Sequence, residues 1–215
     1  MSEIAIVIGN KNYSSWSLRG WLAIKRCGIE FDEIILLLDM PDTKEKLIQN
    51  SKAGLVPVLK CADITIWETM AICEYLAETY PAARLWPDDA KTHAYCRSVS
   101  NKMHAGFVPL RCHMPMDIKI TYPGEGRGPR VKDIIARIVD IWADFRKYFG
   151  QNGPFLFGEF TIADAMFAPV VACFKTFAVD VPEVTMAYIG AVCECPEMQE
   201  WRAAAEAETQ IIKYV

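Results

Sequence analysis

Apolar and polar positions follow two different patterns along the chain, and the change falls near residue 80. Before it, apolar runs bounded by glycine or polar residues predict short strands, and between these runs the apolar positions recur at helical spacing. After it, only helical spacing remains. The expected strands are 4–9, 31–38, 54–61 and 63–67, and the expected helices that accompany them are about 17–27, 43–50 and 69–78.

The order of these elements, β-α-β-α-β-β-α, resembles the thioredoxin-like fold, in which a proline-introduced hairpin and a last helix follow a βαβ unit. We therefore expect an α/β domain at 1–80. Residues 81–90, PAARLWPDDA, carry two prolines and two acids and predict a linker. The remainder, 91–215, is expected to be an all-helical domain. Its helices are predicted at 91–114, 129–148, 161–177, 184–193 and 197–208.

Composition and charge limit the partners of the protein. Its 215 residues are 52% apolar, which is enough for a sizeable core, and the formal charge of -4 leaves no basic excess to neutralise nucleic acid. No apolar run approaches the ~20 residues that span a bilayer. The amino terminus, MSEIAIVIGN, has an acidic start and no signal-peptide pattern. We expect a cytoplasmic protein with small-molecule or protein partners, and no nucleic acid or membrane.

Eight cysteines are spread through apolar segments instead of forming a close framework. Without a secretion signal, this distribution favours reduced thiols in the core. Cys193 and Cys195 are separated by one residue, whereas a zinc or redox pair has two, and no second pair follows at finger spacing. We therefore expect no metal cofactor.

The segment NYSSWSLRGWL, at 12–22, places three hydroxyls where an apolar helix is expected to begin, although a helix N-cap needs only one. Ser17 is nearest to the apolar pattern and is assigned the cap. Ser14 and Ser15 then lie near free N-H groups at the positive end of the helix dipole, where a thiolate is stabilised and its pKa lowered. On this segment alone, a simple cap in a solvated turn is the favoured interpretation.

Two later segments carry groups suited to a peptide-like ligand. In GLVPVL, Pro57 begins a strand, and a cis bond before it would turn the N-H and C=O of Val56 outward to pair with an extended peptide. An ordinary strand start is the alternative. In WETMAICEYL, Glu68 and Thr69 open a helix, where they would bind an ammonium and a carboxylate or simply cap the helix.

In combination, SSWSLRGWLAI, GLVPVL and ETMAICEYLAETYP resemble the glutathione transferases in order and spacing. The closest resemblance is to the zeta class, whose signature is Ser-Ser-Cys followed by a serine, an aromatic residue and an arginine. It extends into RSVSNKMHAGFVPLR and FGEFTIADAMFAPVVACFKTFAVDV, and so covers nearly the whole chain. Trp16 replaces the signature cysteine, Leu18 the aromatic residue, and Glu68-Thr69 the usual Gln-Ser. These departures put the identity of the isomerase substrate in doubt more than they do the binding of glutathione.

The resemblance implies a homodimeric enzyme that uses glutathione as co-substrate and activates its thiolate for attack on a small electrophile. It places the γ-glutamyl end at Glu68 and Thr69, the cysteinyl backbone at Val56 beside Pro57, and the sulfur at Ser14, with Ser15 as the fallback. One alternative is glutathione-dependent cis-trans isomerisation of a diacid such as maleylacetoacetate. The other is a non-catalytic binding protein that has kept the fold.

The stripe of Met103, Phe107 and Leu110 with Arg111 has the helical spacing of a core, but the corresponding helix of the family lines the electrophile cleft. The resemblance therefore implies that Arg111 meets a substrate carboxylate, and that Tyr13, Trp16 and His104 border the same cleft. The motif TIAD is different, because Thr161 and Asp164 have the spacing of a helix capping box, and we assign it a structural role.

Overall fold

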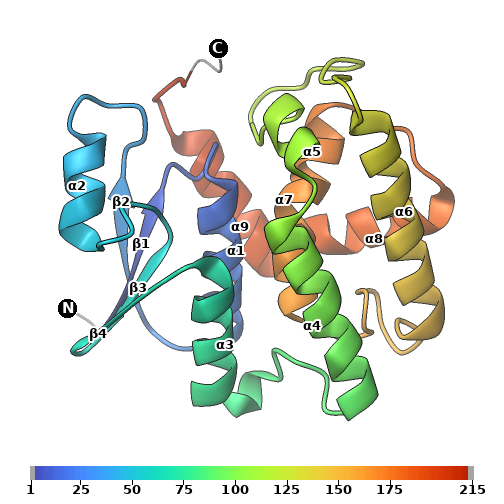
Figure 1. Ribbon diagram of the computed structural model, residues 1–215, viewed down its shortest axis with the longest axis horizontal. Helices are drawn as coiled ribbons and strands as arrows, with labels where there is room; N and C mark the ends of the chain where they lie inside the picture. The colour runs from blue at the N-terminus through green and yellow to red at the C-terminus, as the bar shows by residue number, and fades with distance from the viewer. Residues whose placement is uncertain (1–2, 213–215) are drawn as a thin grey trace.

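The computed structural model describes residues 3–212. A four-stranded sheet with three helices lies beside a larger group of helices, and the chain passes from the first part to the second through the connection between α3 and α4 (Figure 1).

The sheet has the strand order β2-β1-β3-β4. Its strands are β1 (Ile4–Gly9), β2 (Asp32–Leu36), β3 (Val58–Cys61) and β4 (Ile64–Trp67). β1 is parallel to β2 and antiparallel to β3, which pairs with β4 in a hairpin. The predicted α/β, thioredoxin-like arrangement is confirmed.

Successive side chains on a strand point to opposite faces, and apolar residues on each face of the sheet pack against helices. Ile6, Ile8 and Leu59 belong to the main core, which also contains residues of α1 (Ser15–Arg26) and α3 (Thr69–Thr79). On the other face, Val7, Leu36 and Val58 form a small cluster with Leu47 of α2 (Thr43–Asn50). The first face is the one that meets the second part of the chain (Figure 1).

After the short 3-10 helix η1 (Pro81–Ala83), the second part is helical. Its helices are α4 (Ala90–Ala105), α5 (Val108–His113), α6 (Val131–Tyr148), α7 (Ile162–Thr176), α8 (Glu183–Glu194) and α9 (Pro196–Ala207). The last four agree with the predicted ranges to within two residues. The expectation of one continuous helix over 91–114 is wrong.

The break between α4 and α5 has a local cause. Pro109 cannot donate a backbone hydrogen bond, and its ring would clash with the carbonyl four residues earlier in a continuing helix. Phe107 instead adopts a left-handed conformation with φ of 57° and precedes a new helix that contains Pro109 in its first turn. The chain therefore changes direction at Gly106 and Phe107, and α5 carries Arg111 along a different axis from α4 (Figure 1).

Helix α7 joins the two parts of the molecule. It packs against α1, α4 and α8, and apart from Lys175 its residues are all buried. The predicted capping box is present at its start, where Asp164 accepts the N-H of Thr161 at 2.8 Å and also that of Leu156 at 3.1 Å. Burial raises the pKa of Asp164 to about 6, although the hydrogen bonds from Thr161 and Leu156 oppose the rise.

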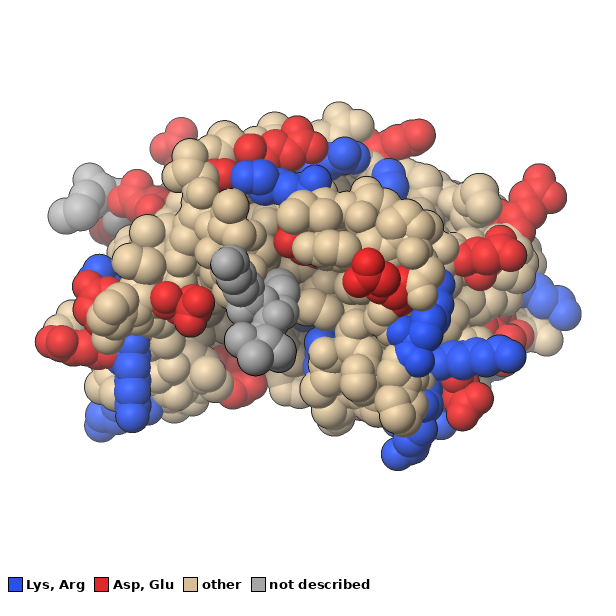
Figure 2. Space-filling view, turned by 90° about the horizontal axis from the view of Figure 1, so that it is seen from above, with Lys and Arg blue, Asp and Glu red and all other residues tan. Residues whose placement is uncertain are grey.

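The cysteines are unpaired thiols, as expected, and five of the eight are buried. Within residues 3–212 no group of three or more His, Cys, Asp or Glu side chains is arranged to hold a metal ion. In the same part of the chain, no helix combines the length and apolar character needed to cross a bilayer. On the face seen in Figure 2, acidic and basic side chains are interspersed among uncharged surface.

Candidate functional site

The first helix begins two residues earlier than predicted, and the assignment of Ser17 as its cap is wrong. The N-H groups of Tyr13 and Ser14 both bond the carbonyl of Asn10, so the chain turns directly after β1 and α1 starts at Ser15. Ser14 occupies the N-cap position. Ser17 lies buried in the first turn, where its hydroxyl accepts the N-H of Gly9 at 2.9 Å.

The serine hydroxyls at this helix start have different environments. Ser14 is 7% exposed, and its hydroxyl donates to that of Ser17 at 2.7 Å. Ser15 is only partly buried and lines an open cavity together with its neighbours Tyr13 and Trp16. Ser14, the predicted contact of the sulfur, does not line the cavity and lies directly before Ser15, which does. The positive end of the α1 dipole and the hydroxyl of Ser15 are therefore at this cavity, and an anion there would be stabilised.

This cavity, which we name the arginine cavity, has a volume of about 240 Å³ and lies between α1, α5, the segment after α5 and α7. It is lined by Tyr13, Ser15, Trp16, Arg19, Leu110, Arg111, Met114, Pro115, Met116, Pro169, Val170 and Cys173. No Asp or Glu of the described residues is among them, so the charges that reach the cavity are positive.

Arg19 is one of these charges and is 1% exposed. Its Nε donates to the carbonyl of Met166 at 2.8 Å and its Nη1 to the carbonyl of Ser15 at 2.9 Å. Burial lowers the pKa of Arg19 to about 9, and the nearby charge of Arg111 acts in the same direction. The group is thus cationic at neutral pH and held in place by neutral carbonyls.

Arg111 is the other charge, and both guanidinium groups lie over the ring of Trp16. The ring centroid is 4.4 Å from Cζ of Arg19 and 5.5 Å from Cζ of Arg111. Arg111 donates to the carbonyl of Gly106, and burial lowers its pKa. Neither arginine forms an ion pair with an acidic residue within 3–212, which leaves their charge available to a ligand.

The remaining predicted pocket residues lie in two different places. His104 does not line the cavity, but its ring is 5.2 Å from that of Trp16, which does. Met103 and Phe107 are buried in the hydrophobic core and do not line the cavity, because helix α4 ends at Ala105 and the turn after it directs Phe107 inward.

The groups expected to bind the peptide part of a ligand lie on the sheet side. The Val56-Pro57 bond is cis, and Pro57 lies against Gly20 of α1, where an added Cβ would be 3.0 Å from the proline ring. Thr69 is buried at the first position of α3, and Glu68 before it has a φ of 69°, which is uncommon for a residue other than glycine. The carboxylate of Glu68 is 3.6 Å from Nε2 of His104.

His104 therefore links the two groups of residues, since it contacts Glu68 on one side and Trp16 on the other. Sequence reasoning missed Arg19 and six other lining residues, which are Met114, Pro115, Met116, Pro169, Val170 and Cys173. Arg19 is part of the motif SSWSLR, and this position in the motif could have identified it as a site residue. The other residues carry no sequence signal, because their position depends on how α7 packs against α1.

Known proteins resemble this chain over most of its length. Residues 13–79 match the family model for the glutathione S-transferase N-terminal domain, and residues 128–204 that for the C-terminal domain. The chain is 30% identical over 178 residues to maleylacetoacetate isomerase of Rattus norvegicus, covering 81% of this chain and 80% of that protein. It is 37% identical over 98 residues to maleylacetoacetate isomerase of Mus musculus, which is 45% of each chain.

Solved structures share the fold. A glutathione transferase homolog from Burkholderia with bound glutathione superimposes with a TM-score of 0.74 at 22% identity, over 95% of this chain and 99% of the other. A maleyl pyruvate isomerase, described as a bacterial zeta-class glutathione S-transferase, gives 0.73 at 18% identity, over 96% and 100%. At these identities the superpositions establish the architecture alone.

Proposed function

Because the chain belongs to the glutathione transferase family and is zeta-like within it, we propose that it activates the thiolate of glutathione for attack on a small electrophile held in the arginine cavity. The observation that carries the proposal is the convergence of the serine-bearing start of α1 with Arg19 and Arg111 at one cavity. The glutathione sulfur would lie at Ser14, with Ser15 as the second choice.

The rest of glutathione would extend along the sheet side of the site. Its cysteinyl backbone would pair with Val56 beside Pro57, and its γ-glutamyl carboxylate would meet Thr69 and the start of α3, with Glu68 facing the ammonium group. The left-handed backbone of Glu68 supports this arrangement, because such conformations cluster at ligand-binding positions. The contact from Glu68 through His104 to Trp16 supports a continuous site.

The chemistry follows from the charges around the sulfur. A free thiol has a pKa near 8.5, and a hydroxyl donor, a helix N-terminus and nearby guanidinium groups all favour its ionised form. Ionisation first releases the thiol proton to solvent. The thiolate then forms a carbon–sulfur bond to the electrophile, and either a leaving group departs with its bonding electrons or, at a double bond, the displaced π electrons take up a proton from solvent. Supplying an ionised nucleophile beside a bound electrophile would account for most of the rate gain, and the proposal requires no metal.

A second candidate reaction is favoured by the pair of arginines. Isomerisation of a diacid such as maleylacetoacetate needs cationic groups for two carboxylates, and the sequence offered Arg111 alone. Arg19 supplies a second guanidinium in the same cavity. In this reaction the thiolate adds to the double bond, the resulting single bond rotates, and the thiolate leaves, so glutathione is regenerated.

Three further features belong to the same proposal. The protein would be a homodimer, an assembly that the resemblance to the family implies. It would be cytoplasmic, which is supported by eight unpaired thiols. The glutathione-binding domain would be 1–80, the linker 81–90 and the electrophile-binding domain 91–215.

Binding and turnover should be tested separately. Calorimetric titration with glutathione comes first, and absence of binding at millimolar ligand would favour the non-catalytic alternative. Conjugation is then measured with 1-chloro-2,4-dinitrobenzene and isomerisation with maleylacetoacetate. Turnover of the diacid with no loss of free thiol would identify the isomerase, whereas stoichiometric loss of thiol would identify the transferase.

A further inference from the structure

Asn12 connects two walls of the arginine cavity without lining the cavity itself. In the chain it directly precedes Tyr13, which with Ser15 belongs to the wall at the start of α1. Its side chain reaches residues 117–119, which directly follow the lining residues 114–116. The partners of this side chain are 105 to 107 positions away in the sequence, so the contact joins the first part of the chain to the second.

The hydrogen bonds of Asn12 fix the orientation of its side-chain amide. Its Oδ1 accepts the N-H of Ile118 at 2.9 Å and that of Lys119 at 3.0 Å, whereas its Nδ2 donates to Oδ1 of Asp117 at 2.9 Å. A reversed amide would direct its NH₂ group at two backbone donors and its oxygen at a carboxylate. Asn12 is 1% exposed and Asp117 is 4% exposed, so water does not compete for these bonds.

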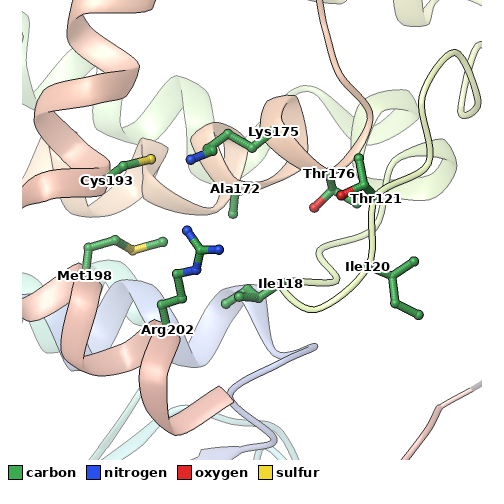
Figure 3. Close-up of a pocket in the computed structure, with 9 residues that line it drawn as sticks. All are labelled: Ile118, Ile120, Thr121, Ala172, Lys175, Thr176, Cys193, Met198 and Arg202. Atoms are coloured by element: carbon green, nitrogen blue, oxygen red, sulfur yellow. The ribbon is translucent and has the colours of Figure 1, made fainter. Parts of the chain in front are cut away.

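The segment that Asn12 contacts is also tied to α7. The hydroxyl of Thr176 donates to the carbonyl of Asp117 at 2.7 Å, and the carbonyl of Thr176 accepts the N-H of Tyr122 at 2.6 Å. Figure 3 shows this segment, with Ile118 on it, passing the end of α7 that carries Thr176. Helix α7 also lines the arginine cavity. The bridge through Asn12 therefore reaches three of the segments that surround the cavity.

Only a side chain that both accepts and donates can make this bridge. Asn12→Asp would still accept the two backbone N-H groups, but its ionised carboxylate could not donate to Asp117 and would repel it. Among residues 3–212, no Lys, Arg or His forms an ion pair with Asp117 that would offset the repulsion. Adding Asp117→Asn restores a donor opposite the carboxylate at position 12. The bridge can therefore be broken by one substitution and remade by a second.

We propose that Asn12 is a positioning residue, which holds residues 114–119 against the start of α1 and so fixes where the electrophile lies relative to the thiolate. This inference rests on the proposed function, since it concerns the electrophile in the arginine cavity. A displacement of about 1 Å between reacting groups can cost a hundredfold in rate. Val56, Glu68 and Thr69 lie before β3 and at the start of α3, outside the segments that Asn12 connects. The bridge therefore acts on the electrophile more than on the peptide part of glutathione.

The test is a calorimetric titration with glutathione and with S-hexylglutathione, whose hexyl group would take the place of the electrophile. The ratio of the two affinities, which we name the hexyl advantage, measures how well the cavity wall packs against a bound group. Asn12→Asp should reduce the hexyl advantage at least about fivefold and change the affinity for glutathione by less than about threefold. Adding Asp117→Asn should return the hexyl advantage to within about twofold of the parent value.

Two further variants separate positioning from a loss of structure. Asn101→Asp makes the same chemical change at an exposed position of α4 and should leave both affinities unchanged. Thermal unfolding is followed for every variant. If Asn12→Asp does not fold, Asn12→Ser carries the same prediction, because it adds no charge and its single hydroxyl is too short to reach both sets of partners.

The results distinguish this inference from the function on which it rests. An unchanged hexyl advantage in a folded variant of Asn12 would overturn the positioning role and leave the proposed function standing. A loss that Asp117→Asn fails to reverse would do the same, since it would show that the bridge between the two side chains is not the cause. If the parent protein binds neither ligand, the proposed function fails, and the positioning role fails with it.

Discussion

The hydroxyl of Ser14 lies 2.7 Å from that of Ser17, whose oxygen also accepts the buried N-H of Gly9 at 2.9 Å. The two hydroxyls therefore act as a pair anchored to the end of β1. A thiolate is a stronger acceptor than a hydroxyl, so the Ser14 hydroxyl would donate its hydrogen bond to the thiolate instead of to Ser17. Ser17 would then donate to Ser14 in turn. This arrangement gives the two serines separate, testable roles.

Ser14→Ala removes the hydroxyl that we propose donates to sulfur. The pKa of the bound glutathione thiol should rise by about one to two, equivalent to about 1.4 to 2.7 kcal/mol, and conjugation at neutral pH should slow accordingly. Glutathione affinity should change less. Thiolate absorbance followed against pH measures the shift, with Ser15→Ala as the comparison. Superimposable titrations of the variant and the parent would contradict the assignment.

Ser17→Ala should act mainly on stability. It leaves the buried N-H of Gly9 without an acceptor, which costs roughly 1 to 3 kcal/mol of unfolding free energy. The thiol pKa should rise less than in Ser14→Ala, because only the second donor of the pair is lost. Chemical denaturation measures the stability, and Ser98→Ala, at an exposed position of α4, is the control with little expected effect. An unchanged unfolding midpoint would exclude the anchoring role.

Much of the fold follows from the sequence, because hydrophobic periodicity decides element type over long segments. The two errors both occur where a local interaction overrides that pattern. At 91–114 the apolar spacing continues through Pro109, but the ring and the missing N-H of proline end the helix. At Ser17 the apolar stripe begins at Leu18, but the turn closed by Asn10 starts the helix earlier.

The candidate site was harder to predict from the sequence than the fold, because part of it is formed by tertiary packing. Its motif residues on α1 and α3 are local and could be found from short segments. The arginine cavity depends on tertiary packing, since α7 brings Met166 to Arg19 and places Val170 opposite α5. No pattern in one segment predicts that Arg19 would be held by a carbonyl 147 positions away.

The buried carboxyl of Asp164 predicts a pH effect on stability. Its pKa is about 6 in the folded protein against 3.8 as the ordinary value, so the native state binds more protons in this range. Stability contributed by Asp164 should therefore be present below pH ~4 and be lost as the pH rises through 6, by roughly 3 kcal/mol. Asp164→Asn cannot ionise, and it should lack this loss.

The measurement is the difference in unfolding free energy between the parent and Asp164→Asn at pH 4 and pH 7. The parent should lose stability relative to the variant over this interval. Asp140→Asn, an exposed position on α6, controls for the change of side chain. The Michaelis constant for glutathione should stay nearly constant in the variant, since the capping box does not line the arginine cavity. A pH-independent difference would contradict the prediction.

Glu208 should position the loop that carries the serines. Its carboxylate accepts the N-H of Lys11 at 2.6 Å and that of Asn12 at 3.0 Å, just before Tyr13 and Ser14. Glu208→Ala should lower stability by about 1 to 2 kcal/mol and raise the Michaelis constant for glutathione, because the loop becomes looser. Glu206→Ala, two residues earlier and exposed, is the control. Faster hydrogen exchange at the amides of Lys11 and Asn12 only in Glu208→Ala would identify the cause.

The effect of replacing Arg111 should show whether the enzyme prefers an electrophile that carries a negative charge. Arg111→Gln removes one cation from the arginine cavity, and a charge-assisted hydrogen bond is worth about 1.5 to 3 kcal/mol. For a carboxylate-bearing electrophile kcat/KM should therefore fall roughly 10- to 150-fold, while for the uncharged 1-chloro-2,4-dinitrobenzene it should change by less than about threefold.

Arg19 requires a milder substitution because its hydrogen bonds to Met166 and Ser15 hold the buried side chain in place. Arg19→Lys keeps the charge but loses the planar arrangement of donors, so it should reduce the rate with a dicarboxylate more than with a monocarboxylate. Thermal unfolding separates this effect from a loss of structure. If Arg111→Gln slows charged and uncharged electrophiles equally, the two arginines serve the thiolate and not the substrate, and the isomerisation candidate loses its support.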